Sequence, residues 1–191
     1  MPMKKLLLAF IFVVICLVSC ADNGNGTAPS VDGGENTPHH SEPEGKPTPP
    51  KIADYASKDL HYTVTLEDGT RSVTMEVSRE GVVSTANVIY PESLSGVSVI
   101  YDAAGLRVRL PYSEADELTV SDEAASGLAV VFDIMKARPK KDSFTDDGCF
   151  SFSVRGILVS LKLSADGMPS EATLERDGSV RVVRFSDFKP Y

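Results

Sequence analysis

Tryptophan is absent from this chain of 191 residues, and histidine and cysteine occur only three times each. After residue 50 only His61 and Cys149 remain of these two types. Metal centres built on His and Cys need several ligands at regular spacing, and a disulfide needs two cysteines. The region also lacks a Gly-x-Ser-x-Gly elbow and a phosphate-binding loop. These absences predict a protein without enzymatic activity, cofactor or metal. A catalytic triad whose residues are distant in the chain and meet only in the fold is not visible in a single sequence.

Basic residues are also scarce. The chain holds 19 Lys and Arg against 27 Asp and Glu, a formal charge of −8. Recognition of nucleic acid rests on Lys and Arg meeting phosphates, so this balance argues against nucleic acid as a partner. The same excess of acidic residues argues against electrostatic attraction of the protein to anionic lipids.

The one long hydrophobic run occupies residues 6–19 and is too short to cross a bilayer, which takes about 20 apolar residues. Lys4 and Lys5 precede it, and the small residue Ser19 ends it. A charged start, a run of this length and a small residue at its end are typical of a secretory signal peptide. The alternatives are an ordinary cleaved signal that leaves Cys20 unmodified, and an anchor that is not cleaved.

The last three residues of this signal and the cysteine that follows, Leu17-Val18-Ser19-Cys20, resemble the lipobox of bacterial lipoproteins. The resemblance implies cleavage after Ser19 and a diacylglyceryl group on the Cys20 thiol. Each buried methylene contributes about 0.8 kcal/mol, so two or more acyl chains hold a protein stably at a membrane. The expected location is the extracytoplasmic face of a bacterial cell membrane. Loss of residues 1–19 would leave 17 basic and 27 acidic residues, a charge of −10.

Residues 20–50 are predicted to form the lipidated N-terminus and a disordered linker rich in Gly and Pro, because almost nothing in them can form a core. His39 and His40 lie in this linker, but two adjacent ligands without a fixed third make a weak metal site. Residues 51–191 are predicted to form one domain, which is long enough for its own hydrophobic core.

From Leu60 onward, apolar and polar residues alternate with a period of two, which predicts strands with one dry face. Three Asp-Gly pairs, each a strong hairpin signal, begin at Asp68, Asp166 and Asp177. The pattern predicts nine strands. Their centres lie near residues 63, 75, 88, 99, 108, 152, 160, 174 and 183.

The alternation stops between residues 113 and 138. Residues 113–123 are polar and acidic and are predicted to form a long loop. Their carboxylates lack the regular ligand spacing and pivot glycine of a calcium loop, which favours a solvated loop. Leu128, Val131, Phe132 and Met135 then follow at helical spacing, with Ser121 or Asp122 as a possible cap and Pro139 as a stop. A helix is favoured here, and a buried strand over residues 128–135 is the alternative.

These elements predict an α+β fold that is mostly β: a curved antiparallel sheet of about nine strands, forming an open half-barrel covered by one helix. The hollow between the sheet and the helix is either filled by side chains or able to hold an apolar ligand. Leu128, Val131, Phe132 and Met135 are the candidate residues of a lid over this hydrophobic groove.

The end of the chain resembles the bacterial lipoprotein-carrier family, which includes the periplasmic lipoprotein chaperones and lipid-anchored relatives. Residues 166–169 (Asp-Gly-Met-Pro), the pair at 177–178 and residues 184–188 (Arg-Phe-Ser-Asp-Phe) carry the likeness. Residues 91–96 are similar to a loop of lipid-anchored relatives. The resemblance implies an open antiparallel barrel closed by helices, with an apolar cavity for acyl chains. The long first helix of the carriers has no counterpart in residues 51–59.

The resulting hypothesis is a membrane-anchored, non-enzymatic lipoprotein that binds an acyl chain, a lipid or a lipoprotein in the half-barrel. The first alternative is an envelope scaffold with a filled core that binds another protein and needs no small ligand. An enzyme at the cell surface is the second alternative, and a pocket with two convergent carboxylates of perturbed pKa would favour it.

Overall fold

In the computed structural model, residues 51–69, 71–111, 117–140, 143–145 and 148–191 are described, with only the backbone of residues 122–126. Ser19, Cys20, the linker with its two histidines, and residues 113–116 of the predicted acidic loop lie outside the described residues. The predictions made on them therefore stay predictions. No helix in the described part of the chain is long and apolar enough to span a membrane.

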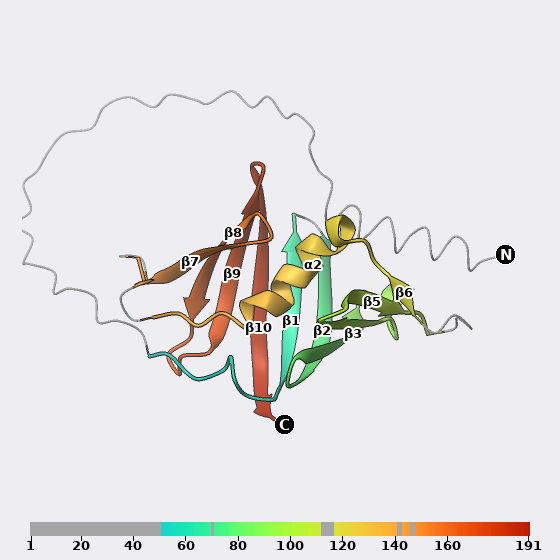
Figure 1. The fold of residues 1–191 in the computed structure, drawn as a ribbon, viewed down its shortest axis with the longest axis horizontal. Helices are drawn as coiled ribbons and strands as arrows, with labels where there is room; N and C mark the ends of the chain where they lie inside the picture. The colour runs from blue at the N-terminus through green and yellow to red at the C-terminus, as the bar shows by residue number, and fades with distance from the viewer. Residues whose placement is uncertain (1–50, 70, 112–116, 141–142, 146–147) are drawn as a thin grey trace, which may run out of the picture.

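The described residues form a single ten-stranded sheet with one α-helix (Figure 1). All strand pairings are antiparallel, and the order is β6-β5-β4-β3-β2-β1-β10-β9-β8-β7. The sheet is not closed, because β6 and β7 are its edges. The strands are β1 Leu60–Asp68, β2 Arg71–Glu80, β3 Val83–Tyr90, β4 Ser98–Asp102, β5 Gly105–Arg109, β6 Leu118–Thr119, β7 Cys149–Val154, β8 Ile157–Leu163, β9 Pro169–Arg176 and β10 Ser179–Pro190. The predicted open half-barrel with one helix is confirmed.

Hairpin turns set the register of the sheet. Asp177 and Gly178 join β9 to β10 with φ angles of 51° and 77°, as expected for two residues that tolerate the left-handed region. Arg155 and Gly156 join β7 to β8 in the same way, with φ angles of 52° and 73°. The second turn has no Asp-Gly signature, and its conformation places an arginine at the tip of a hairpin.

The structure has one strand more than predicted. Residues 113–123 were predicted to form a loop, but Leu118–Thr119 pairs with β5 as the short strand β6. Ion pairs explain why this polar segment docks. Glu117 contacts the Nε of Arg107 at 3.1 Å and the guanidinium of Arg109 at 3.0 Å. These charges draw the segment to the sheet edge without an apolar pattern.

The helix, α2, spans Asp122–Ile134, so the helix and not the alternative strand is confirmed over most of residues 128–135. Ser121 occupies the N-cap position, although its side chain makes no capping hydrogen bond. A short 3₁₀ helix, η1 (Glu92–Leu94), lies in the predicted loop between β3 and β4. Residues 51–59 contain turns and no helix, as predicted.

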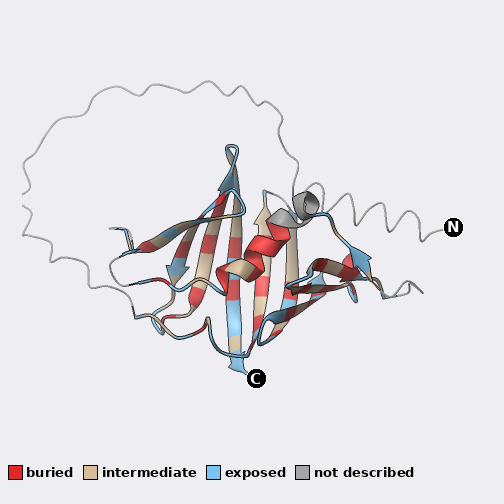
Figure 2. Ribbon diagram, in the orientation of Figure 1, coloured by how far each residue is buried: buried red, intermediate tan, exposed pale blue. Residues whose placement is uncertain are grey.

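The core lies between the inner face of the sheet and α2. Figure 1 shows α2 crossing the central strands β10, β1 and β2, and Figure 2 shows buried residues concentrated there. Alternate residues of each strand supply the core, for example Tyr62, Val64 and Leu66 of β1. The other face of the sheet is mainly polar, with Thr65 and Thr74 bonded to each other at 3.2 Å. One dry face and one wet face are what the period-two alternation predicts.

Candidate functional site

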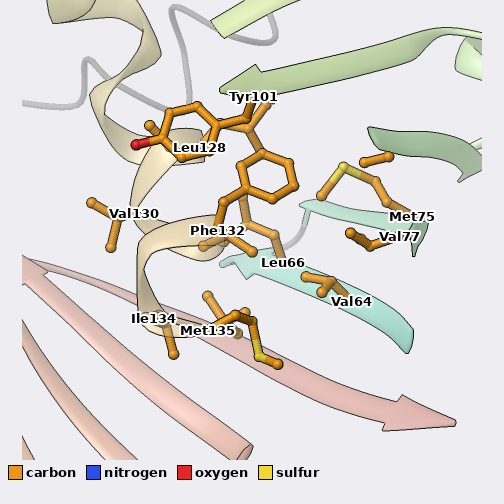
Figure 3. Packing of buried hydrophobic residues seen from close by; sticks show 14 of the residues in the cluster. Val64, Leu66, Met75, Val77, Tyr101, Leu128, Val130, Phe132, Ile134 and Met135 are labelled. Carbon is orange, nitrogen blue, oxygen red and sulfur yellow. The ribbon is translucent and has the colours of Figure 1, made fainter. Parts of the chain in front are cut away.

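The four residues predicted to form a lid all lie in the core. Leu128 is 9% exposed, and Val131, Phe132 and Met135 are 0% exposed. Figure 3 shows Phe132 and Met135 on the helix face that points toward Val64 and Leu66, and the Phe132 ring stacks on Tyr101 at 5.3 Å between centroids. A side chain with no exposed surface borders neither solvent nor a water-sized cavity. Side chains of α2 therefore fill the central part of the half-barrel.

The inner face continues beyond α2 onto β7, where it is only partly covered. Phe150, Phe152 and Val154 point to this face, because each pairs with a buried residue of β8. Their partners Leu161, Val159 and Ile157 are at most 3% exposed, whereas the β7 residues are partly exposed. Sheet order explains the difference, since β7 is an edge strand with a neighbour on one side only.

Three of the eight phenylalanines gather at this edge. The Phe144 ring lies 6.0 Å from Phe150, and Phe150 stacks on Phe152 at 5.1 Å. We call Phe144, Phe150 and Phe152 the β7 aromatic cluster. The period-two alternation puts Phe150 and Phe152 on the dry face of the predicted strand centred near residue 152, but alternation alone does not distinguish them from ordinary core residues. The feature of the sequence that could have identified the cluster is the presence of three phenylalanines within the nine residues 144–152.

Partly exposed apolar residues also connect the centre of the sheet with β7. On β10, Phe188 stacks on Tyr62 at 5.5 Å. Met168, just before β9, and Leu163 of β8 come next in strand order, and both are partly buried against the core. We call Phe188, Met168 and Leu163 the apolar row. It runs from β10 toward the β7 aromatic cluster.

A buried arginine holds the end of α2. Arg79 of β2 is 2% exposed and donates from Nη1 to the carbonyl of Met135 at 2.7 Å. Its Nε donates to the carbonyl of Lys58 at 3.1 Å, and its Nη2 donates to the carbonyls of Tyr55 and Lys58. The contact with Met135 places a cation at the negative end of the helix dipole. Arg79 thereby ties the helix end to residues 55–58.

A second polar cluster ties the same helix end to both halves of the sheet. The Asp133 carboxylate accepts from the Tyr101 hydroxyl of β4 at 2.7 Å and from Nε of Arg155 at 2.9 Å. Lys136 contacts the same carboxylate at 3.3 Å and lies 4.4 Å over the Tyr101 ring. The Arg155 guanidinium also donates to the Tyr101 hydroxyl at 2.7 Å. Since Arg155 comes from the β7–β8 turn, this Asp133 cluster bridges strands that the sheet order separates widely.

Electrostatics in the Asp133 cluster follow from these contacts. Burial, reinforced by the hydrogen bond to Asp133, raises the pKa of Tyr101 above its ordinary value. The hydrogen bond to Asp133 raises the pKa of Arg155. The Asp133 carboxylate is thus engaged by two cations and a hydroxyl, which leaves it poorly placed for acid–base chemistry.

Three hydroxyls inside the described core have no hydrogen-bond partner: those of Tyr55, Tyr62 and Ser84. Each residue is at most 2% exposed. Burial raises the pKa of Tyr55 to about 12. Burial also raises the pKa of Tyr62, and the positive charge of Arg79 opposes this shift in part. Buried polar groups are normally paired, so unpaired ones require a reason.

Residues 51–59 close one end of the half-barrel against the β8–β9 turn. The Ala53 amide donates to the Gly167 carbonyl at 3.0 Å. A Cβ on Gly167 would lie 2.6 Å from the Ala53 nitrogen and 2.7 Å from the Lys51 oxygen. Only glycine permits this approach, and its φ of 86° also favours glycine. Tyr55, two residues on, is 1% exposed and belongs to the core.

The residues that could carry chemistry are dispersed. Among the described residues, no three His, Cys, Asp or Glu side chains are grouped as metal ligands. His61 points to the wet face of β1, where its ring stacks on Tyr191 at 4.7 Å. Cys149 is buried at the start of β7. The arrangement supplies apolar surface and buried donors.

No family model matches the chain, and no curated protein matches its sequence. A search of solved structures finds similarity to a LolA superfamily protein from Nitrosomonas europaea. The similarity has a TM-score of 0.36 at 12% sequence identity, and it covers 71% of this chain and 87% of that chain.

Proposed function

We propose that this protein is a bacterial lipoprotein, anchored by Cys20 on the extracytoplasmic face of a membrane, whose half-barrel binds an acyl chain. The acyl chain would belong to a lipid or to another lipoprotein. The observation that carries the proposal is the partly exposed β7 aromatic cluster, which extends an otherwise buried inner face past the end of α2. The sequence resemblance to lipoprotein carriers supports the same class of ligand.

Apolar contact would drive binding at this surface. Each methylene removed from water contributes about 0.8 kcal/mol, so a chain segment of four or five methylenes contributes roughly 3–4 kcal/mol before binding losses. The aromatic rings offer large apolar area on a rigid strand at little cost in side-chain entropy. Because the cluster lies beyond α2, a chain can dock on it while Val131, Phe132 and Met135 stay packed.

The binding part is tested by photo-cross-linking of the full chain in phosphatidylcholine vesicles with a diazirine-bearing hexadecanoic acid. We expect label on peptides that contain residues 144–152, and we expect the F150S/F152S variant to lose most of it. The matched control is Leu158→Ser, which removes an apolar residue that is 48% exposed on the opposite face of the neighbouring strand. Equal labelling of F150S/F152S and the wild type would refute the proposed site.

The anchoring part is tested separately by Cys20→Ala. Loss of the acyl group should remove metabolic labelling with palmitate and abolish cleavage after Ser19. Labelling that persists in the variant would contradict lipidation at Cys20. We propose further that the domain acts without catalysis, because the described acidic groups nearest its core are held in ion pairs.

One observation favours a second candidate function. The side chains of α2 facing the sheet are fully packed, and this suits an envelope scaffold that needs no small ligand. In that case cross-linking in cells would capture one dominant protein partner. The partner would contact the edge strand or wet face, and F150S/F152S would leave lipid labelling unchanged.

A further inference from the structure

Side chains bridge the open side of the half-barrel. In the sheet order, five strands separate β4 from β8, and Figure 1 shows β7 and β8 on one side of α2 and β5 and β6 on the other. Arg155, in the turn between β7 and β8, nevertheless donates from Nη2 to the Tyr101 hydroxyl of β4 at 2.7 Å. Its Nε donates to the Asp133 carboxylate of α2 at 2.9 Å. Arg155 therefore joins two flanks of the sheet that the backbone leaves apart.

The backbone of Arg155 indicates that these contacts hold the turn in place. Among the described residues, three that are not glycine have a positive φ: Arg155, Asp177 and Asp187. Aspartate tolerates the left-handed region because its short side chain can bond to the nearby backbone, whereas arginine lacks this advantage. A disfavoured backbone conformation persists where the surrounding structure holds it, and such residues often lie at sites that change conformation. The hydrogen bonds to Asp133 and Tyr101 supply that support for Arg155.

Helix α2 is the fixed partner in this contact. Val131, Phe132 and Ile134 have no exposed surface, and Arg79 binds the carbonyl of Met135 at the end of the helix at 2.7 Å. A movement of α2 away from the sheet would expose these side chains to water and break the contact with Arg79. The loss of hydrophobic free energy makes such a movement costly.

The hairpin of β7 and β8 is held more weakly along its outer strand. β7 has a neighbour on one side only, and Phe150, Phe152 and Val154 on its inner face are partly exposed. The ion pair at the tip of the hairpin also meets solvent, since the side chains of Arg155 and Asp133 are 33% and 16% exposed. Ion pairs that water reaches contribute little to stability and break easily. Segments with few buried contacts open locally while the rest of a fold stays intact.

We infer that the contacts of Arg155 with Asp133 and Tyr101 form a clasp, whose release lets β7 and the β7–β8 turn move away from α2 and admit an acyl chain. The moving element is the edge hairpin, and the helix that covers the sheet stays in place. The acyl chain then covers the partly exposed β7 aromatic cluster. This inference rests on the proposed function, and it adds the contact that controls access to the binding surface.

The test measures amide hydrogen exchange by mass spectrometry on the full chain in phosphatidylcholine vesicles. Arg155→Met keeps the length of the side chain and removes its charge and hydrogen bonds. We expect amide exchange in residues 149–157 to become about fivefold faster, which corresponds to about 1 kcal/mol for one partly exposed ion pair. Exchange in residues 127–135 of α2 should match the wild type. Labelling of residues 144–152 by the diazirine-bearing hexadecanoic acid should rise by a similar factor.

Two further variants separate the clasp from a general loss of stability. Arg155→Asn creates an Asn-Gly pair with Gly156, the pair preferred in a hairpin turn, so it strengthens the turn while it removes the clasp. Labelling by the acyl probe should therefore rise in Arg155→Asn as well. The matched control is Arg184→Met, which removes the ion pairs with Glu67 and Glu171 on the wet face. It should leave both labelling and the exchange of residues 149–157 unchanged.

The clasp and the proposed function fail in different ways. If residues 149–157 of Arg155→Met exchange like those of the wild type, the clasp is refuted and acyl binding stands. Faster exchange without a rise in labelling refutes control of access by the hairpin. Faster exchange in residues 127–135 also refutes the inference, because the helix is then the moving element. If the acyl probe labels none of the proteins, acyl binding is refuted and control of access falls with it.

Discussion

Replacing Tyr55 by phenylalanine should make the domain more stable at neutral pH and less sensitive to alkali. The Tyr55 hydroxyl is buried without a partner, and such a group costs roughly 1–3 kcal/mol. Loss of this oxygen creates little cavity, because the ring remains. We therefore expect Y55F to raise the free energy of unfolding by about 1 kcal/mol at pH 7.

The alkaline effect follows from the shift in pKa. Burial raises the pKa of Tyr55 from 10.0 to about 12 in the folded protein. Between these values the unfolded chain has released the proton and the folded chain has kept it, so stability falls as pH rises. For one group shifted this far, the loss reaches about 2 kcal/mol near pH 11.5. Tyr62, whose pKa burial also raises, adds to the slope in the wild type.

The assay is urea unfolding of the wild type and Y55F between pH 7 and about pH 11.5. Circular dichroism follows unfolding, and absorbance near 295 nm follows tyrosine ionisation without interference from tryptophan, which the chain lacks. Tyr90→Phe removes a hydroxyl from a residue that is 55% exposed and should leave stability at pH 7 unchanged. Parallel losses of stability with pH in the wild type and Y55F would refute the reasoning.

Three further changes should lower stability. Phe132→Ala removes a ring with no exposed surface and should cost about 3–5 kcal/mol in chemical denaturation, so a loss below 1 kcal/mol would show a loosely packed helix. Asp133→Asn should lower the free energy of unfolding by about 1–2 kcal/mol, a modest loss because the partners of Asp133 are partly exposed to solvent. A double-mutant cycle with Arg155→Met should measure a favourable interaction energy between Asp133 and Arg155. Gly167→Ala forces the backbone of Ala53 away and should expose residues 51–59 to limited proteolysis. Unchanged cleavage there would contradict the close approach that the structure shows.

The period-two pattern was enough to predict one antiparallel sheet and its dry face, and the helical spacing of apolar residues before Pro139 predicted the single helix. Residues 128–135 were ambiguous because valine and phenylalanine suit a strand as well as a buried helix. Tertiary packing decides between them, since Val130 and Ile134, which lie outside the predicted stripe, are 0% exposed like Val131, Phe132 and Met135 within it. A helix buried on several sides loses the polar face that makes amphipathic helices easy to recognise.

Strand β6 was not predicted, for a different reason. It is held by the ion pairs of Glu117 with Arg107 and Arg109, and the alternation of apolar residues does not report long-range pairs of charges. The polar contacts that hold the end of α2 could not be predicted from the sequence either, because they depend on the order of the strands in the sheet. Arg79 and Met135 are 56 positions apart, and Tyr101 and Arg155 are 54 apart. Only the register and curvature of the sheet bring them together.

The pairing of β1 with β10 sets when this domain can fold. These two strands lie side by side in the middle of the sheet, yet residues 69–178 separate them along the chain. As the ribosome extends the chain from its N-terminus, β1 lacks one neighbour until the last strand has been made. Non-local pairing of this kind is slow, because the ends of a long loop must meet first. The sheet is therefore completed only after β10 has been made, because β10 alone joins the half that contains β1–β6 to the half that contains β7–β9.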